Sequence, residues 1–117
     1  MKNHKRDLNL VLVMTTSWIP YGKEKEVGQK YLEVTKKYPM DRSLEKNLVP
    51  MGVKATKKGI KVFSVAEVKQ GKYEELIKRI TEMQLAYSEI EGFKYKVETY
   101  LTGVDAMPLV GLRMPDL

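Results

Sequence analysis

The spacing of hydrophobic positions changes several times along the chain, and the first changes predict a buried strand followed by a helix. Residues 8–19 carry apolar side chains on both alternating faces, which is typical of a strand covered on both sides. Residues 23–38 repeat apolar positions at helical spacing, with lysine and glutamate around the rest of the helix. Pro39 should end this helix, because proline cannot continue the backbone hydrogen-bond pattern. The chain therefore begins with a strand–helix unit.

Two alternating segments follow a polar loop and predict a β-hairpin. Residues 48–56 and 60–69 are expected to be strands joined by a turn at Gly59. Pro50 cannot donate a ladder hydrogen bond, so the first of these strands is expected at an edge of the sheet. The polar loop before them is expected to span residues 40–47.

The last regular pattern is a helix followed by a strand. Gly71 precedes the helix, and Gly92 is a suitable stop after it. Residues 93–102 alternate as a strand whose lysines discourage edge-to-edge aggregation. The expected buried stripe of the helix consists of Leu76, Ile77, Ile80, Met83, Tyr87 and Ile90.

This order predicts an α+β fold of the ferredoxin-like βαββαβ type. Right-handed connections place both helices on one face of a four-stranded antiparallel sheet. The expected order across the sheet is fourth, first, third and second strand, with the doubly apolar first strand inside. Residues 1–117 are expected to form a single domain, with the ferredoxin-like core at residues 8–103 and an apolar C-terminal tail at residues 104–117.

The arrangement leaves one sheet face without helices, which we call the open face. It should present apolar side chains of the first strand, and an uncovered apolar face of this kind is expected to bind something. A second copy of the chain, a nucleic acid and a small ligand are the three candidates. The apolar tail is expected to pack on its own domain or on a partner subunit, because disordered tails are normally polar. Predicted open-face residues of the third and fourth strands are Lys61, Phe63, Val65, Glu67, Lys94, Lys96 and Glu98.

The amino-acid composition excludes several kinds of functional site. The 117-residue chain has no cysteine, which excludes disulfides, thiolate metal sites and cysteine nucleophiles and is compatible with the cytoplasm, where we expect the protein. The net charge of +6 could attract nucleic acid or anionic lipid, but lysines interleaved with glutamates favour a solvated surface. The uncharged stretch 8–22 is shorter than the about 20 apolar residues of a membrane span, and no signal-peptide cleavage site follows it.

The chain resembles the dimeric α+β barrel superfamily, which includes antibiotic-biosynthesis-type monooxygenases and stress-responsive barrel proteins. The resemblance covers residues 8–103 and rests on the element order and on the segments Trp18–Pro20, Gly71–Glu75 and Phe93–Thr99. It implies a homodimer through the open face and a pocket for a small organic ligand between sheet and helices. Members that bind haem or act on quinol-like substrates often use a pocket histidine. This chain has only His4, before the first strand, so no haem and no other cofactor are expected.

RNA-recognition modules share the element order and stack bases on the open face. Their third-strand signature matches here at Lys58 and Gly59, but Ile60, Val62 and Val65 stand where stacking aromatics are expected. The missing aromatics argue against nucleic acid as a partner, and single-stranded RNA binding through the open face is kept as an alternative.

No nucleophile–base pair, phosphate-binding loop or metal cluster occurs in the sequence. We expect a protein without catalytic activity that binds a small apolar or aromatic ligand or has a structural role. A cofactor-independent monooxygenase or isomerase is the enzymatic alternative, in which a carboxylate beside a phenol supports proton transfer. Packing aromatics and strand-end hydroxyls are the simpler interpretation of the same residues. The predicted ligand-binding residues are Thr16, Trp18, Tyr21, Glu67 and Tyr100.

Overall fold

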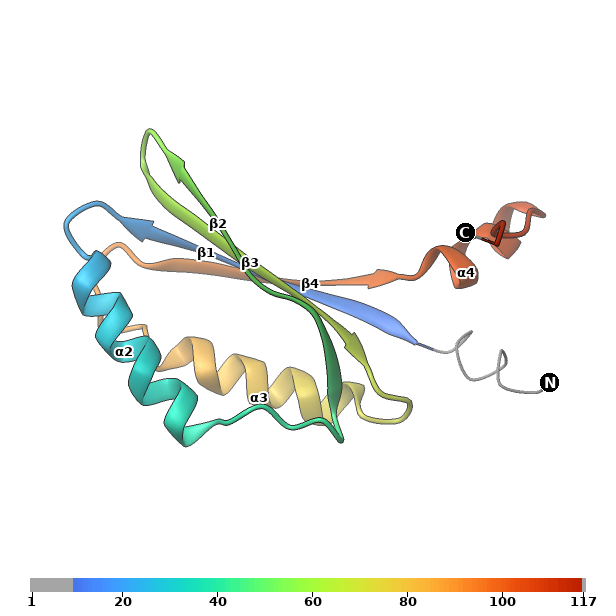
Figure 1. Cartoon of the computed structure of the whole chain (residues 1–117), viewed down its shortest axis with the longest axis horizontal. Helices are drawn as coiled ribbons and strands as arrows, with labels where there is room; N and C mark the ends of the chain where they lie inside the picture. The colour runs from blue at the N-terminus through green and yellow to red at the C-terminus, as the bar shows by residue number, and fades with distance from the viewer. Residues whose placement is uncertain (1–9, 117) are drawn as a thin grey trace.

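The computed structural model describes residues 10–116 and has two α-helices on one side of a four-stranded antiparallel sheet (Figure 1). The strands are β1 (Val11–Pro20), β2 (Glu45–Thr56), β3 (Gly59–Val68) and β4 (Lys94–Leu101). The helices are α2 (Glu24–Lys37), α3 (Tyr73–Leu85) and the short α4 (Gly103–Ala106), which is followed by the 3-10 turn η1 (Met107–Val110). His4 and the first two residues of the predicted first strand lie outside the described residues.

The sheet order is β2-β3-β1-β4, which is the predicted order, and the sheet is open. β1 is an inner strand because it pairs with β3 on one side and with β4 on the other. β2 is an edge strand, as its proline required. Pro50 lies in the irregular stretch between Val49 and Gly52, where the register of β2 against β3 shifts.

β2 begins three residues earlier than expected. The predicted polar loop 40–47 overlaps this strand, because Glu45 pairs with Val68 and Asn47 pairs with Ala66. An edge strand tolerates polar residues because one of its sides is not paired, so polarity alone was a poor guide to where the strand begins. The prediction was therefore wrong at this boundary.

The loop before β2 contains a core residue that the pattern did not reveal. Leu44 is 2% exposed and packs with Val13, Val68 and Leu76. Asp41 organises the turn, since its carboxylate accepts hydrogen bonds from the backbone and the hydroxyl of Ser43. These bonds stabilise the charged form and hold the pKa of Asp41 below its usual value. The turn thus carries a single apolar residue into the core.

α3 is shorter than its apolar stripe suggested. The helix ends at Leu85, and the next residues form tighter turns in which the amides of Tyr87 and Ser88 donate to carbonyls three residues earlier. Tyr87 and Ile90 are nevertheless buried, because these turns continue to direct the chain along the core. The burial of both residues was predicted correctly, whereas their helical assignment was wrong.

Buried side chains form two separate clusters between sheet and helices. The first joins β1, β3 and the start of α3 around Val13 and Leu76. The second joins α2 to the turns after α3, where the rings of Tyr87 and Phe93 stack with centroids 4.8 Å apart. Val27 and Val34 are the buried residues of α2 in this second cluster. The two clusters lie at different places along the sheet, which leaves room between them.

The open face follows the predicted register. Cross-strand pairs place Lys61 and Lys94 beside Trp18, and Val65 and Glu98 beside Met14. The helix-covered face carries the alternate positions, including Val13 and Val97 of the first core cluster. A shift of one residue would exchange these two sets of side chains, so the register decides what each face can do.

On the open face, the ring of Phe63 lies directly against the backbone of β2. A Cβ atom at Gly52 would overlap this ring, whereas a Cβ at Gly28 in α2 has no other atom within 4 Å. We predict that Gly52→Ala lowers the free energy of unfolding by about 1–3 kcal/mol, because the ring must leave its site. Gly28→Ala, the matched control, should raise it by up to about 1 kcal/mol through helix propensity. Urea denaturation of both variants is the measurement, and equal effects would contradict the proposed contact.

Candidate ligand-binding cavity

A cavity of about 750 Å³ lies between the sheet and the two long helices. Such a volume is within the range of small-molecule sites, about 300–1,000 Å³. The floor is the helix-covered face of β1, β2 and β3, and the walls come from α2, α3 and the segment after α3. Most of the lining is apolar or aromatic. Aromatic side chains in the lining are Tyr31, Tyr38, Tyr87 and Phe93, whereas Phe63 borders the cavity from β3 with its ring on the open face.

The cavity exists because small side chains occupy the middle of its floor. Thr15 and Ser64 are paired across β1 and β3, and Ala66 is paired with Val13 in the next row on this face. These side chains are shorter than the valine, isoleucine or leucine that fill most sheet–helix cores. On the opposite wall Gly28 of α2 has no side chain to fill the space. The floor and the wall are therefore both recessed at the same place.

The mouth of the cavity lies between α2 and β2. Its lining residues on these two elements, Tyr31, Met51 and Val53, are 42%, 47% and 62% exposed. Deeper lining residues such as Val13 and Val34 are buried. A ligand could enter at this edge and reach the hydroxyl groups of the floor.

Polar side chains also contribute to the lining, and besides the tyrosines they are Thr15, Ser17, Glu24, Thr35, Glu45, Asn47, Ser64, Arg79 and Gln84. The side-chain oxygen Oε1 of Gln84 is buried and has no hydrogen-bond partner among the described residues. A buried acceptor without a partner costs about 1–3 kcal/mol, so a donor on a bound molecule would be favoured there. The hydroxyl-bearing residues of the floor are Thr15, Ser17 and Ser64.

A charged pair of residues lies at another part of the lining. Burial raises the pKa of Glu45, and the positive charge of Arg79 opposes that shift. The Arg79 guanidinium donates to the carbonyl of Pro39 and lies 5.5 Å from the centroid of the Tyr38 ring. These contacts fix Arg79 close to the end of α2. The lining thus combines apolar side chains with two carboxyl groups, of Glu24 and Glu45, and one guanidinium.

The five predicted ligand-binding residues do not line this cavity. Thr16 and Trp18 lie on the open face, where Thr16 is 3% exposed between its partners Phe63 and Lys96. Tyr21 follows β1, and its hydroxyl donates to the carbonyl of Thr56. A role for these residues in ligand binding stays a prediction that concerns the other side of the sheet.

Glu67 and Tyr100 are also on the open face, as expected. Both pair with Leu12, one from β3 and the other from β4, so the width of β1 separates them. Two strand spacings separate their backbones by about 10 Å, and the described residues show no hydrogen bond between the carboxylate and the phenol. A proton-transfer role for this pair stays a prediction.

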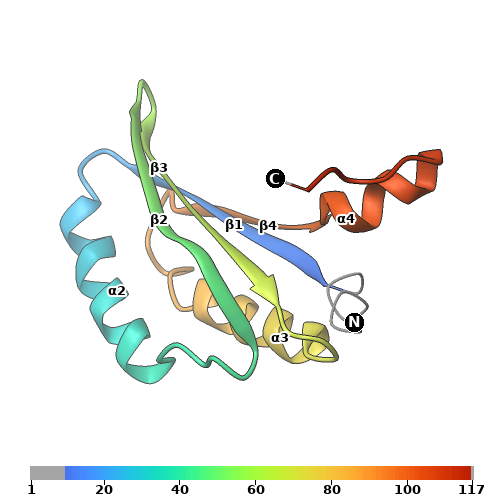
Figure 2. The ribbon, with the colours of Figure 1, turned by 45° about the vertical axis from the view of Figure 1, so that its right-hand side comes forward.

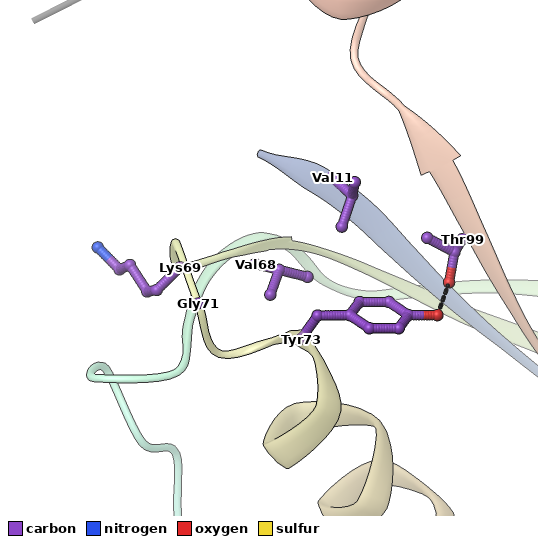
Figure 3. A pocket seen from close by; sticks show the side chains of 6 residues that line it. All are labelled: Val11, Val68, Lys69, Gly71, Tyr73 and Thr99. Carbon is purple, nitrogen blue, oxygen red and sulfur yellow. Dashed lines mark hydrogen bonds between the residues drawn. The ribbon is translucent and has the colours of Figure 1, made fainter. Parts of the chain in front are cut away.

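A second, smaller depression of about 200 Å³ lies where α3 begins (Figure 3). The hydroxyl groups of Tyr73 and Thr99 are 2.8 Å apart and join α3 to β4. Val11, Val68, Lys69 and Gly71 complete the lining. Its size and its single hydroxyl pair make it a packing feature rather than a second ligand site.

Within residues 10–116 no group of three or more histidine, cysteine, aspartate or glutamate side chains could hold a metal ion. None of the helices described is long and apolar enough to cross a membrane. Ligand binding in the cavity would therefore depend on the apolar side chains and the polar groups of its lining.

No family model and no curated protein matches the sequence. Among solved structures, the de novo designed protein Foldit4 is similar with a TM-score of 0.51 and 10% identity, over 80% of this chain and 97% of the designed one. A tripeptidase from Staphylococcus aureus subsp. aureus Mu50 has a TM-score of 0.45 and 9% identity, over 77% of this chain and 28% of the tripeptidase. The first similarity supports the α+β fold and carries no information on function.

The lining residues could have been found from one signal in the sequence. Thr15, Ser17 and Ser64 occupy positions of β1 and β3 that alternate with open-face residues, where apolar residues are expected under helices. Sequence reasoning instead followed the aromatic side chains and the charged side chains of the opposite face. The depth of the cavity also depends on how far the helices stand from the sheet, which has no local signal.

Burial raises the pKa of Tyr87 to about 12, with a smaller contribution from Tyr31. An unfolded tyrosine ionises near pH 10, so this phenol contributes stability that is complete below about pH 10. We predict that this stability is lost as the pH rises from about 10 to about 12. Tyr87→Phe should remove that part of the pH dependence in denaturation experiments. If the stability of the wild type and that of Tyr87→Phe change in parallel with pH through this range, the raised pKa of Tyr87 is contradicted.

Proposed function

We propose that the protein is a homodimer of the dimeric α+β barrel type and that each subunit binds a small apolar or aromatic molecule in the cavity under its sheet. The observation that carries the proposal is the cavity itself. About 750 Å³ of space, lined mainly by apolar and aromatic side chains, occupies the centre of a layer that would otherwise be core. An apolar ligand would restore the contacts that the lining lacks.

The chemistry of the lining favours a neutral ligand with one hydrogen-bond donor. Aromatic walls suit a planar molecule, and the unpartnered oxygen of Gln84 would accept from its hydroxyl or amino group. If the protein were an enzyme of the cofactor-independent type, Glu45 would be the candidate proton acceptor. Its pKa is raised and it lies within the lining, unlike Glu67.

The cavity can be tested with an anilinonaphthalene sulfonate dye, which fluoresces in apolar sites. Ser64→Leu would place a larger side chain on the floor, and we predict at least about tenfold weaker dye binding with retained stability. Val65→Leu is the matched control, because Val65 is the next residue of β3 and faces the other side of the sheet. A wild type that does not bind the dye, or a loss of dye binding only in Val65→Leu, would contradict ligand binding in the cavity. Either result would favour a structural role for the protein.

The homodimer is supported by the composition of the open face. Half-buried apolar side chains of the two inner strands have no cover in the subunit, and they include Leu12, Met14, Phe63 and Val65. A second copy can cover them if it is rotated about a two-fold axis that lies between the sheets, perpendicular to the strands. At one end of each sheet lie Trp18, Lys61 and Lys94, and at the other end lie Glu67 and Tyr100. The rotation places the first end of one subunit over the second end of its partner.

The dimer predicts a simple effect of charge at the centre of the open face. Met14→Lys should shift the protein from dimer to monomer at micromolar concentration in sedimentation experiments, since it places a charged side chain at the centre of the apolar interface. The subunit should stay folded, because a lysine on an open sheet face can reach solvent. Leu32→Lys is the control, on the exposed side of α2. A monomeric wild type that binds mixed single-stranded oligonucleotides would assign the open face to nucleic acid instead.

A further inference from the structure

We propose that residues 102–116 form a clasp that packs on the second subunit and supplies contact area that the open face lacks. This inference rests on the proposed homodimer and names the part of the chain that completes its interface. The segment comprises α4, η1 and the residues that follow them.

The segment is folded but has little support of its own. The Thr102 side chain accepts a hydrogen bond from the amide of Asp105 at the start of α4, and η1 ends at Gly111 in the left-handed conformation. The Met114 side chain returns to pack against Gly103, and a Cβ atom added at Gly103 would lie 3.0 Å from the Met114 sulfur. Helices of one turn are not stable alone, so this conformation needs an external surface.

Its apolar side chains point to solvent in the single subunit. Leu109 is 75% exposed and Val110 is 72% exposed, and Leu112 and Val104 are exposed as well. α4 contacts β4 and η1, and the segment extends beyond the end of the sheet (Figures 1 and 2). A run of neighbouring apolar side chains without cover marks an interaction site.

The position of the segment agrees with the proposed dimer. It continues from β4 past the exposed Tyr100 and Leu101, and it lies on the side of the sheet away from α2 and α3 (Figure 2). This is the side on which a second copy would cover the open face. The two-fold rotation proposed above places the Leu101 end of β4 over the opposite end of the partner's sheet, where Trp18 lies.

The area of the open face by itself is small for a stable dimer. Four strands of 10, 12, 10 and 8 residues, at about 3.3 Å per residue and spaced about 4.8 Å apart, give a flat patch of about 630 Å². Specific dimers bury about 800 Å² per partner. The exposed apolar residues of the segment can provide the difference, because several such side chains bury a few hundred Å².

Charge also favours a second copy as the occupant. The segment carries Asp105 and Asp116 against a single arginine, Arg113. The Trp18 end of the partner's open face carries four lysines, of which only Lys96 has a carboxylate within ion-pair distance among the described residues. The net negative charge of the segment would thus lie against the net positive charge at this end of the partner's open face. The lysines at that end are Lys54, Lys61, Lys94 and Lys96.

The first experiment measures the dimer dissociation constant by sedimentation equilibrium. The double variant Leu109→Lys with Val110→Lys should weaken the dimer at least about tenfold, because it charges two apolar contacts of the clasp. Its thermal unfolding as a monomer should match the wild type, since both side chains are exposed in the subunit. Leu85→Lys at the end of α3, 53% exposed, is the matched control and should leave the constant unchanged.

The second experiment locates the clasp. The described residues include no cysteine, and neither does the sequence, so Leu109→Cys accepts one paramagnetic label. A labelled, NMR-silent subunit mixed with a ¹⁵N wild-type subunit should broaden the amides of Trp18 and Lys61 in the wild-type partner. Amides of Trp18 and Lys61 that stay sharp in the ¹⁵N partner of a mixed dimer, or an unchanged dissociation constant of the double variant, would overturn the clasp while the dimer stands. A wild type that is monomeric removes the dimer and the clasp together.

Discussion

The pairing of β1 with both β3 and β4 is the constraint on which the rest of the structure depends. It places the most apolar strand inside the sheet and fixes, residue by residue, which side chains face the helices and which face away. Thr15 lies over the cavity and Thr16 lies on the open face because of this register alone. A slip of one residue would exchange the two sets and remove both proposed sites.

The two faces of the sheet differ in how they are completed. The helix-covered face is closed at its ends by two apolar clusters and is recessed between them, where short side chains and Gly28 leave a cavity. On the open face the ring of Phe63 lies against Gly52, and apolar side chains of the inner strands have no cover in the subunit. In our proposal one face receives a small molecule and the other receives a second copy of the chain. A sheet with helices on one side only can offer both.

Much of the fold could be predicted from periodicity because most elements have one buried side. The element order with right-handed connections predicted the order of the strands, and the two-sided apolar pattern of β1 and the proline of β2 agreed with it. The errors occurred where polar residues lie in regular structure or apolar residues in turns. Glu45 to Asn47 belong to an edge strand, and Leu44 enters the core from a turn that Asp41 organises. A pocket between sheet and helices was expected, but its lining residues were not predicted, since the candidate residues lie on or near the opposite face.

The sequence by itself determined the order of the elements, the two faces of each strand and the apolar character of the C-terminal segment. These properties are local, since alternation and helical spacing are set by the backbone geometry of each element. The tertiary structure decided which small side chains meet across β1 and β3, how far α2 and α3 stand from them, and that Leu12 separates Glu67 from Tyr100. Those are distances between residues far apart in the chain, and they follow from register and packing, for which a single sequence carries no local signal.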